Sequence, residues 1–149
     1  MSREVAERLN AVLARVPYAR FLGVRAELAG DEMTAILPYS PHLIGNPILP
    51  ALHGGVIGAF MEITAMAQLA QGEKFARIPK PINVSVQYLR SGRAVDTFAR
   101  ATVNRVGRTI ANVEAFAWQD EPDHPIATLQ IHFLMAAGGH GGALGRPGQ

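Results

Sequence analysis

Apolar residues near the N-terminus recur with helical spacing. Within residues 2–15, Val5, Leu9 and Val12 follow one another at intervals of three or four, and polar residues fill the positions between them. Pro17 comes directly after this pattern and lacks the N–H that a continuing helix would need. The pattern therefore predicts an amphipathic N-terminal helix that packs on the rest of the domain and stops at Pro17.

Two strand-like segments and a long punctuated segment follow. Residues 22–29 and 33–38 read as strands, and the letters GDE between them read as a hairpin turn. Residues 38–55 contain four prolines and three glycines in eighteen positions. This density predicts a segment without regular structure, and long irregular segments of this kind are often functional.

Residues 53–70, HGGVIGAFMEITAMAQLA, form the most apolar stretch of the chain. They carry a single formal charge, Glu62. Apolar residues lie on every side of the helix that this stretch predicts, and a helix of that kind is normally buried all round. We therefore expect a long central helix that a curled sheet encloses together with either a second subunit or the N-terminal helix.

Alternating apolar and polar positions dominate the C-terminal half. Residues 82–89 alternate with period two, residues 93–120 read as two strands that break near Gly107, and residues 124–137 read as one more. Four consecutive strands with short turns favour an antiparallel sheet. Together with the first two strands, they predict an α+β protein in which a six-stranded antiparallel sheet curls around the central helix.

Length and composition favour one domain. A chain of 149 residues, 48% hydrophobic and 17% charged, is long enough for one sizeable core. We expect the domain to span 1–137, with its N-terminal helix in 1–16, and the glycine-rich 138–149 to form a disordered tail. The sequence predicts a cytoplasmic protein, because it shows neither a bilayer-spanning apolar run nor a signal peptide. The absence of cysteine excludes disulfides and a thiol nucleophile.

Basic residues gather in one part of the chain, although the net charge is only +2. Between residues 74 and 108, eight basic residues face one acidic residue, Asp96. One interpretation is a solvated strand face, and the other is a patch for an anionic ligand, since guanidinium groups suit phosphate. Nucleic acid is disfavoured because no basic helix or zinc module accompanies the charge. The eight are Lys74, Arg77, Lys80, Arg90, Arg93, Arg100, Arg105 and Arg108.

Three stretches, NPILPALHGGVIGAFMEITAMAQLA, INVSVQYLRSGR and RVGRTIANVEAFAWQ, resemble the PaaI-like branch of the hotdog acyl-CoA thioesterases. The resemblance covers nearly the whole chain up to the glycine-rich tail. It implies the hotdog fold, in which a sheet wraps a central helix. It also implies a site formed by an Asn, a His-Gly-Gly turn and an acidic residue nine positions after the His. The matching residues are Asn46, His53, Gly54, Gly55 and Glu62.

The chain departs from the family pattern at two positions. Many relatives have Asp where this chain has Glu62, and the Ser or Thr that some carry at the start of the next strand falls near Pro81. Both acidic side chains are carboxylates, although Glu reaches one methylene further. A reaction step assisted by a hydroxyl at the second position has no candidate here.

The residues support the same chemistry without the family. The helix N-terminus at Gly54 and Gly55 offers unpaired N–H groups and a partial positive charge, and is either an oxyanion pocket or a simple capping turn. His53 is expected to fix the loop rather than act as a base. Asn46 orients a water or the carboxylate, or is an ordinary turn residue before a proline.

Glu62 has no Arg or Lys within two helical turns, and a carboxylate in an apolar setting is costly unless it is paired or neutralised. Either its side chain escapes to solvent, or desolvation makes it a better base or nucleophile. A thioester would then be hydrolysed by a water that Glu62 deprotonates, or by carboxylate attack that gives a mixed anhydride. Both routes remain open.

Coenzyme A carries phosphates, so the basic segment gains a role as their binding site. Arg90, Arg93 and Arg108 are candidates at predicted strand ends, and Phe60, with Leu43 and Ile48, is expected to line the acyl pocket. The prediction includes no metal and no cofactor other than the CoA of the substrate. The alternatives are a hotdog dehydratase or hydratase, which would need a closer His–carboxylate pair than His53 and Glu62, and a non-catalytic acyl-CoA binding protein.

We expect a homodimer or a homotetramer built as a dimer of dimers, since the central helix and an edge strand would otherwise leave apolar surface in water. Gly54 and Glu62 are eight residues apart, or about 12 Å along a helix axis. This separation predicts a composite site, with Gly54 from one subunit and Glu62 from its partner. Neither nucleic acid nor a membrane is an expected partner.

Overall fold

The computed structural model describes residues 2–30, 32–72 and 79–135. Its helices are α1 (Ser2–Ala14), α2 (Pro17–Leu22), a short 3-10 helix (Pro41–Leu43) and α3 (Gly54–Gly72). The predicted first and central helices are confirmed. The basic residues Lys74 and Arg77 and the predicted tail lie outside the described residues.

Pro17 begins a helix as well as ending one, and the sequence analysis missed this second helix. It occupies the first turn of α2, where its missing N–H costs nothing because helix starts leave those groups unpaired. Gly23 ends α2 in the left-handed region, at φ 83°, and its N–H donates to the carbonyls of Ala19 and Arg20. The helix is too short to show a clear period in the sequence.

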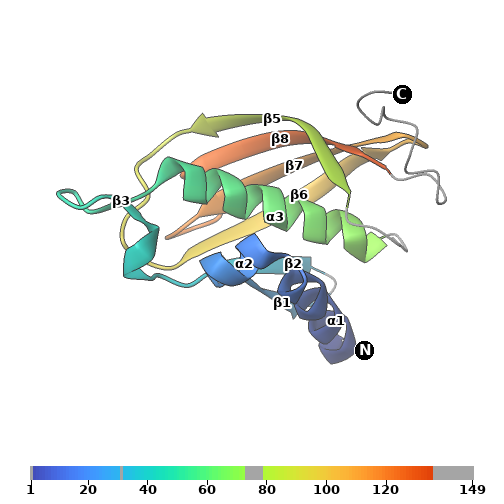
Figure 1. Ribbon diagram of the computed structural model, residues 1–149, viewed down its shortest axis with the longest axis horizontal. Helices are drawn as coiled ribbons and strands as arrows, with labels where there is room; N and C mark the ends of the chain where they lie inside the picture. The colour runs from blue at the N-terminus through green and yellow to red at the C-terminus, as the bar shows by residue number, and fades with distance from the viewer. Residues whose placement is uncertain (1, 31, 73–78, 136–149) are drawn as a thin grey trace, which may run out of the picture.

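Six strands form one antiparallel sheet in the order β1-β2-β6-β7-β8-β5 (Figure 1). The predicted hairpin of the first two strands is confirmed, as are the four later strands. The chain crosses from β5 at one edge to β6 in the interior, so that β6, β7 and β8 pair in sequence and β5 then pairs with β8. The strands are β1 (Arg25–Ala29), β2 (Glu32–Leu37), β5 (Lys80–Tyr88), β6 (Thr97–Val106), β7 (Ile110–Trp118) and β8 (Ala127–Leu134).

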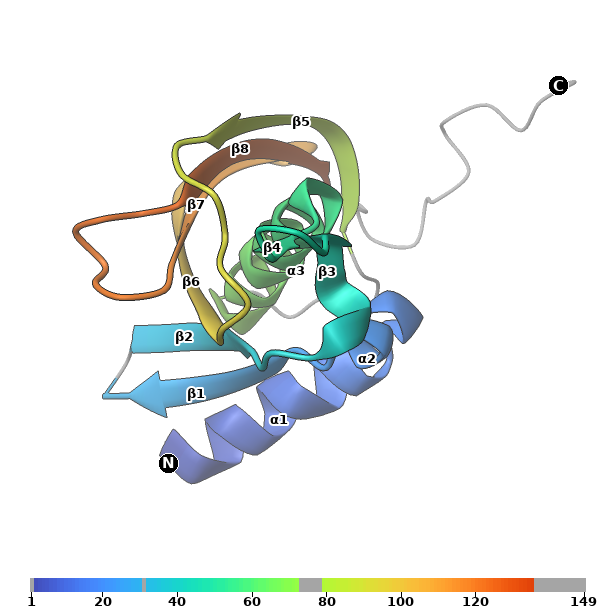
Figure 2. The same ribbon diagram turned by 90° about the vertical axis from the view of Figure 1, so that its left-hand side faces the viewer.

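The sheet curls around α3, as the view along the helix shows (Figure 2). Inward-facing residues alternate along the strands, such as Val113 and Ala115 on β7 and Leu129 and Ile131 on β8. They meet the buried residues of α3 in one hydrophobic core. This arrangement is the hotdog fold, and it confirms the predicted architecture.

Helix α1 covers the remaining side and is fixed to the sheet edge by Asn10. The side-chain amide of Asn10 donates to the Ala26 carbonyl at 3.0 Å, and its oxygen accepts from the Ala26 N–H at 2.9 Å. The amide therefore mimics the backbone of a neighbouring strand for β1. Among the described residues, no helix is long and apolar enough to cross a membrane.

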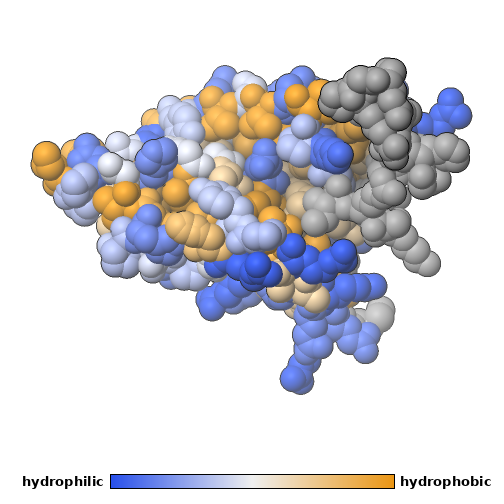
Figure 3. Space-filling model, viewed as in Figure 1, coloured by the Kyte–Doolittle hydropathy of each residue, from blue (hydrophilic) through white to orange (hydrophobic). Residues whose placement is uncertain are grey.

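The punctuated segment before α3 contains more regular structure than predicted. After the 3-10 helix, β3 (Ile44–Asn46) and β4 (Ala51–Leu52) pair as a small antiparallel sheet. The hairpin they form projects beyond the start of α3, and its tip is apolar in the surface view (Figures 1 and 3). The tip includes Ile48, whose surface is 90% exposed. Both strands are too short for an alternating pattern to reveal them.

Strand β5 lies at an edge of the sheet, and no described strand pairs with its outer side. Its apolar side chains remain exposed, among them Ile82, Val84 and Tyr88. An apolar band lies over this edge in Figure 3. Exposed apolar edge strands are surfaces on which another chain can pair.

Candidate functional site

The N-terminus of α3 is built from His53, Gly54 and Gly55, as the sequence analysis predicted. The Gly55 N–H donates to His53 Nδ1 at 2.9 Å, and the N–H groups of Val56 and Ile57 donate to the His53 carbonyl at 3.0 and 3.2 Å. His53 Nδ1 is therefore an acceptor, and a neutral ring carries its proton on Nε2. His53 acts as the cap of the helix, which agrees with the expected role in fixing the loop.

The Gly54 N–H makes no hydrogen bond to any residue that the structure describes. It belongs to the same peptide group as the His53 carbonyl, which two N–H groups of the first turn hold in place. The neighbouring Gly55 N–H is already used by the His53 ring. Of the two glycine N–H groups in the predicted site, Gly54 is thus the one available to a ligand.

Glycines around this turn make room for it. A Cβ on Gly45 of β3 would lie 2.7 Å from the His53 Cα, and a Cβ on Gly92 would lie 2.9 Å from Ile57 Cδ1. Real Cβ atoms do not approach so closely, so Gly45 requires glycine for reasons of space, whereas at Gly92 the end of the Ile57 side chain would have to move. The strand, the turn and the loop after β5 consequently pack directly on the start of α3.

Tyr88, at the end of β5, also contacts this turn, and the sequence analysis assigned it no role. Its hydroxyl donates to the Gly54 carbonyl at 2.7 Å. Period-two alternation does place Tyr88 on the inner face with Val84 and Val86. The contact itself joins residues 34 positions apart and therefore needed the tertiary structure to be found.

Asn46 lies on the projecting hairpin and not against the helix start. Its side-chain oxygen accepts from the N–H groups of Ile48 and Leu49, at 2.9 and 3.4 Å. These bonds form a local turn that stiffens the apolar tip. In this structure Asn46 has the turn role that the sequence analysis left open beside a catalytic one.

Glu62 lies two turns along α3 and is half-buried. Desolvation by burial raises the pKa of its carboxyl above the usual 4.5. Among the described residues, no salt bridge joins it to a cation. The apolar setting predicted for this carboxylate is therefore present, although only in part.

The helix α3 is not buried all round within one subunit, and its complete enclosure with a second subunit stays a prediction. Gly55, Ala59 and Glu62 lie on one face of the helix, and all three keep some exposure. Their small neighbours leave the carboxylate open to a ligand or to another chain. The opposite faces, including Phe60 and Met61, are fully buried.

The three predicted phosphate-binding arginines do not gather at one place. The backbone of Arg93 forms an isolated β-bridge with Ala51 of β4, and Arg90 lies two residues after Tyr88, just beyond β5. Both arginines therefore lie at the end of the sheet where α3 begins. Arg93 is also paired with Asp120 at 2.6 Å. Arg108 lies in the β6–β7 turn at the other end of the sheet. The length of β5, which runs between the two ends, is about 26 Å.

The residues expected around the acyl group are also divided. Phe60 and Leu43 are buried in the hydrophobic core, so they can meet an acyl chain only if the core opens. Ile48 is at the exposed hairpin tip, away from both. Within one subunit these three side chains do not form a common wall.

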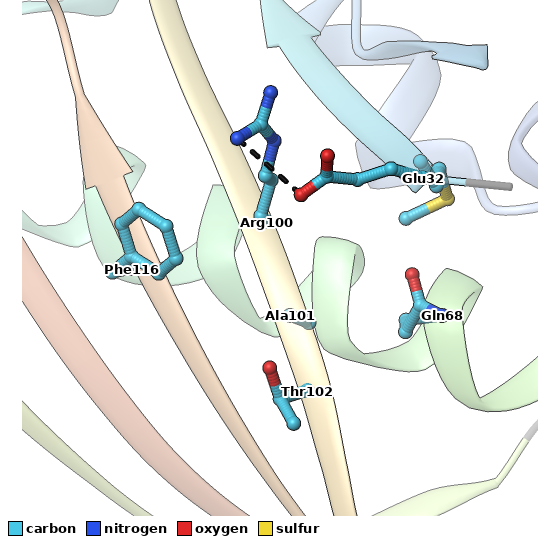
Figure 4. Close-up of a pocket in the computed structure, with 7 residues that line it drawn as sticks. Glu32, Gln68, Arg100, Ala101, Thr102 and Phe116 are labelled. Carbon is cyan, nitrogen blue, oxygen red and sulfur yellow. Dashed lines mark ion pairs between the residues drawn. The ribbon is translucent and has the colours of Figure 1, made fainter. Parts of the chain in front are cut away.

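A cavity of about 370 Å³ lies elsewhere, where β2 separates from β6 (Figure 4). None of the predicted site residues lines it. Its one cation, Arg100, is engaged by Glu32 at 3.4 Å and by the Thr34 hydroxyl at 3.0 Å, and it lies over the Trp118 ring. The lining residues are Glu32, Met33, Gln68, Arg100, Ala101, Thr102 and Phe116.

No group of three or more potential metal ligands occurs among residues 2–30, 32–72 and 79–135. The chemical groups at the candidate site are therefore a backbone donor, a carboxylate with a raised pKa, a capping histidine and a tyrosine hydroxyl. A donor at a helix start and a general base are the parts that acyl transfer to water needs.

Comparison with known proteins agrees with this chemistry. The family model described as the thioesterase superfamily matches residues 49–126. A Chromobacterium violaceum protein of known structure is 31% identical, with a TM-score of 0.70 over 91% of this chain and 98% of that one. A search of the curated proteins finds no match.

Two more distant structures share the fold. A Bacillus halodurans protein, solved with CoA, is 17% identical and has a TM-score of 0.73, covering 91% of this chain and 93% of that one. A phenylacetic acid degradation-related protein from Ralstonia eutropha is 22% identical, with a TM-score of 0.70 over 85% and 98% of the two chains.

The raised pKa of Glu62 predicts a pH-dependent effect on stability. A carboxyl whose pKa is raised by folding stabilises the fold below pH 4.5, and this contribution is lost as the pH rises through the folded-state pKa. Glu62→Gln should therefore raise the melting temperature at pH 7 to 8, with a gap over wild type that shrinks towards pH 4. Glu121→Gln, in an exposed turn, is the matched control. A gap that stays constant with pH would contradict the desolvated carboxylate.

Proposed function

Because the chain belongs to the thioesterase superfamily, we propose that it hydrolyses acyl-CoA thioesters to the free acid and CoA. Glu62 is the general base or nucleophile, and the Gly54 N–H is the oxyanion donor. The observation that supports this most directly is a half-buried carboxylate of raised pKa on the helix whose first N–H is free. The CoA-containing structure of the Bacillus halodurans protein supports CoA as the leaving group.

The chemistry needs one water and two protein groups. Glu62 takes a proton from water as the hydroxide oxygen bonds to the thioester carbon, or its carboxylate attacks that carbon and water later hydrolyses the anhydride. The carbonyl oxygen becomes negative in either route, and the Gly54 N–H with the helix dipole stabilises it. The carbon–sulfur bond then breaks, and the CoA sulfur takes the proton that Glu62 holds in the base route, or a proton from water in the anhydride route.

We propose that two subunits complete each site. The N–H of Gly54 and the carboxylate of Glu62 are separated by about 12 Å along α3, further than a thioester spans. The open edge of β5 is the surface for pairing with a second copy, and twofold pairing would set the two α3 helices antiparallel. A homodimer, or a homotetramer made from two of these dimers, would then hold Gly54 of one chain near Glu62 of the other.

The same pairing accounts for the divided arginines. Antiparallel pairing places the start of one β5 beside the end of the other. Arg90 and Arg93 would therefore bind phosphates of CoA from one subunit, while Arg108 could approach the same phosphates only from its partner. Arg93 is shared with Asp120, which leaves Arg90 as the freer cation. The acyl group extends towards the half-exposed face of α3 and the apolar hairpin tip.

The first test is a panel of short, medium-chain and aromatic acyl-CoA esters with a colorimetric thiol readout. The chain contains no cysteine, so it adds no background. At least one ester should release CoA, and Glu62→Gln should lower turnover on the order of a hundredfold or more. A dehydratase would change the acyl double bonds without releasing thiol, and a binding protein would hold the ester unchanged. Either result would refute hydrolysis.

The arginines can be tested with paired substrates. Arg90→Ala with Arg93→Ala should raise KM about tenfold or more for CoA thioesters, since charge-assisted phosphate contacts are lost. The same variant should keep its KM for the matching pantetheine thioesters, which lack the nucleotide. Arg105→Ala, an exposed arginine on β6, is the control. If KM rises equally for both substrates, the arginines do not bind the phosphates.

The shared site can be tested by complementation. Gly54→Pro removes the donor N–H at the first helical position, where proline is tolerated, and circular dichroism verifies that the helix persists. Gly54→Pro and Glu62→Gln should each be inactive. Co-refolding them should restore about a quarter of wild-type activity, since half of randomly paired dimers contain one working site of two. Heterodimers that form but stay inactive would show that both groups act within one chain.

A further inference from the structure

We propose that Tyr88 is a positioning residue, which holds the first turn of α3 so that the Gly54 N–H is aimed at the reacting carbonyl oxygen. The inference rests on the proposed function for its catalytic consequence. Its structural part, that the Tyr88 hydroxyl orders the donor, stands on contacts in the subunit alone.

Tyr88 and His53 hold opposite ends of one peptide group. The Tyr88 hydroxyl donates to the Gly54 carbonyl at 2.7 Å, and the N–H of the same peptide, that of Gly55, donates to His53 Nδ1 at 2.9 Å. The preceding peptide group has its carbonyl held by the Val56 and Ile57 N–H groups. The two peptide groups on either side of the Gly54 Cα are thus both held by hydrogen bonds. The free Gly54 N–H belongs to the first of them, so its direction is fixed.

The tyrosine ring packs on the side of the helix that carries two glycines. A Cβ on Gly54 would lie 3.4 Å from the ring, and a Cβ on Gly58 would lie 3.4 Å from the hydroxyl oxygen. Gly54 and Gly58 are one turn apart on the side of α3 that faces β5. A methyl group at either position would make ordinary van der Waals contact with Tyr88, so the hydroxyl reaches the helix backbone without a steric requirement for glycine.

The strand end that carries Tyr88 is itself anchored. Tyr88 pairs with Ala127 of β8, and the N–H groups of Leu89 and Arg90 both donate to the Ile126 carbonyl, at 2.8 and 3.0 Å. The hydroxyl therefore connects the helix start to the hydrogen-bonded frame of the sheet. First turns of helices have few internal bonds and fray readily, so this connection opposes local motion of the donor.

Burial does not explain the contact. Tyr88 remains 54% exposed, so its ring contributes less to the core than the inward-facing aliphatic residues of the sheet. Its distinctive contribution is the hydrogen bond to Gly54. Oxyanion donors act only when they are aligned with the developing charge, and a bond to the carbonyl of the next peptide maintains that alignment.

The test is Tyr88→Phe, which removes the hydroxyl and keeps the ring. We expect kcat to fall about tenfold while KM stays within about twofold, because alignment matters most in the transition state. Amide hydrogen exchange at Gly55 and Val56, whose N–H groups are bonded to His53, should become several-fold faster when measured without substrate. Tyr18→Phe on α2, with similar exposure and no hydroxyl bond among the described residues, should change neither quantity.

The proposal would be overturned by unchanged exchange at Gly55 and Val56, or by faster exchange there with kcat unaltered. A rise in KM with constant kcat would also overturn it, since that pattern indicates lost ground-state binding. If wild-type protein releases no CoA from any ester, the proposed function fails. The exchange measurement then still decides whether Tyr88 orders the helix start.

Discussion

Glu62 lies on an apolar helix, where its carboxylate is destabilised as an anion. The rest of the proposed site depends on this constraint. The side chain has no cation within salt-bridge distance among the described residues, and burial raises its pKa. A fold gains no stability from such a group at neutral pH. Its position is explained if the carboxylate accepts a proton during a reaction, and a protein stabilised by its large core can tolerate the cost.

The fold places the other reacting group on the same helix. Sheet curvature encloses most of α3, glycines at Gly45 and Gly92 bring strands and loops onto its first turn, and His53 caps it. The partly exposed residues of the helix include Gly55, Ala59 and Glu62, which lie on one face. In one subunit this helix face is partly exposed, and the outer side of β5 pairs with no described strand. Contact with a second copy of the chain would explain both surfaces.

Periodic patterns that extend over many residues predicted the fold well. The 3.6-residue and two-residue spacings located α1, α3 and the last four strands of the main sheet, and the turn signal between two short strand-like segments located the hairpin of β1 and β2. The helix at Pro17 and the pair β3 and β4 were missed, since six residues make fewer than two helical turns and strands of two or three residues show no alternation. The path from β5 across the sheet to β6 is a tertiary choice that local spacing does not encode.

The candidate site was predictable where one stretch of chain contains the chemistry. His53, Gly54 and Glu62 are within ten residues of one another, so helix geometry alone could relate them. Tyr88 was missed because its partner is 34 residues away. Arg90, Arg93 and Arg108 were expected at strand ends, and the register of β5, β8 and β7 places Arg108 at the opposite end of the sheet from the other two.

The central claim is that the desolvated carboxylate of Glu62 is the group that initiates hydrolysis. Carbon-13 labelling of glutamate side chains allows its titration to be followed by NMR, with Glu62→Gln to assign the signal. The pH dependence of kcat/KM reports the ionisation of the same group in the free enzyme. The account predicts that both curves share one midpoint above pH 4.5 and that activity falls on the acidic side. A Glu62 midpoint at or below 4.5, or an acidic limb of kcat/KM at a different pH, would contradict it.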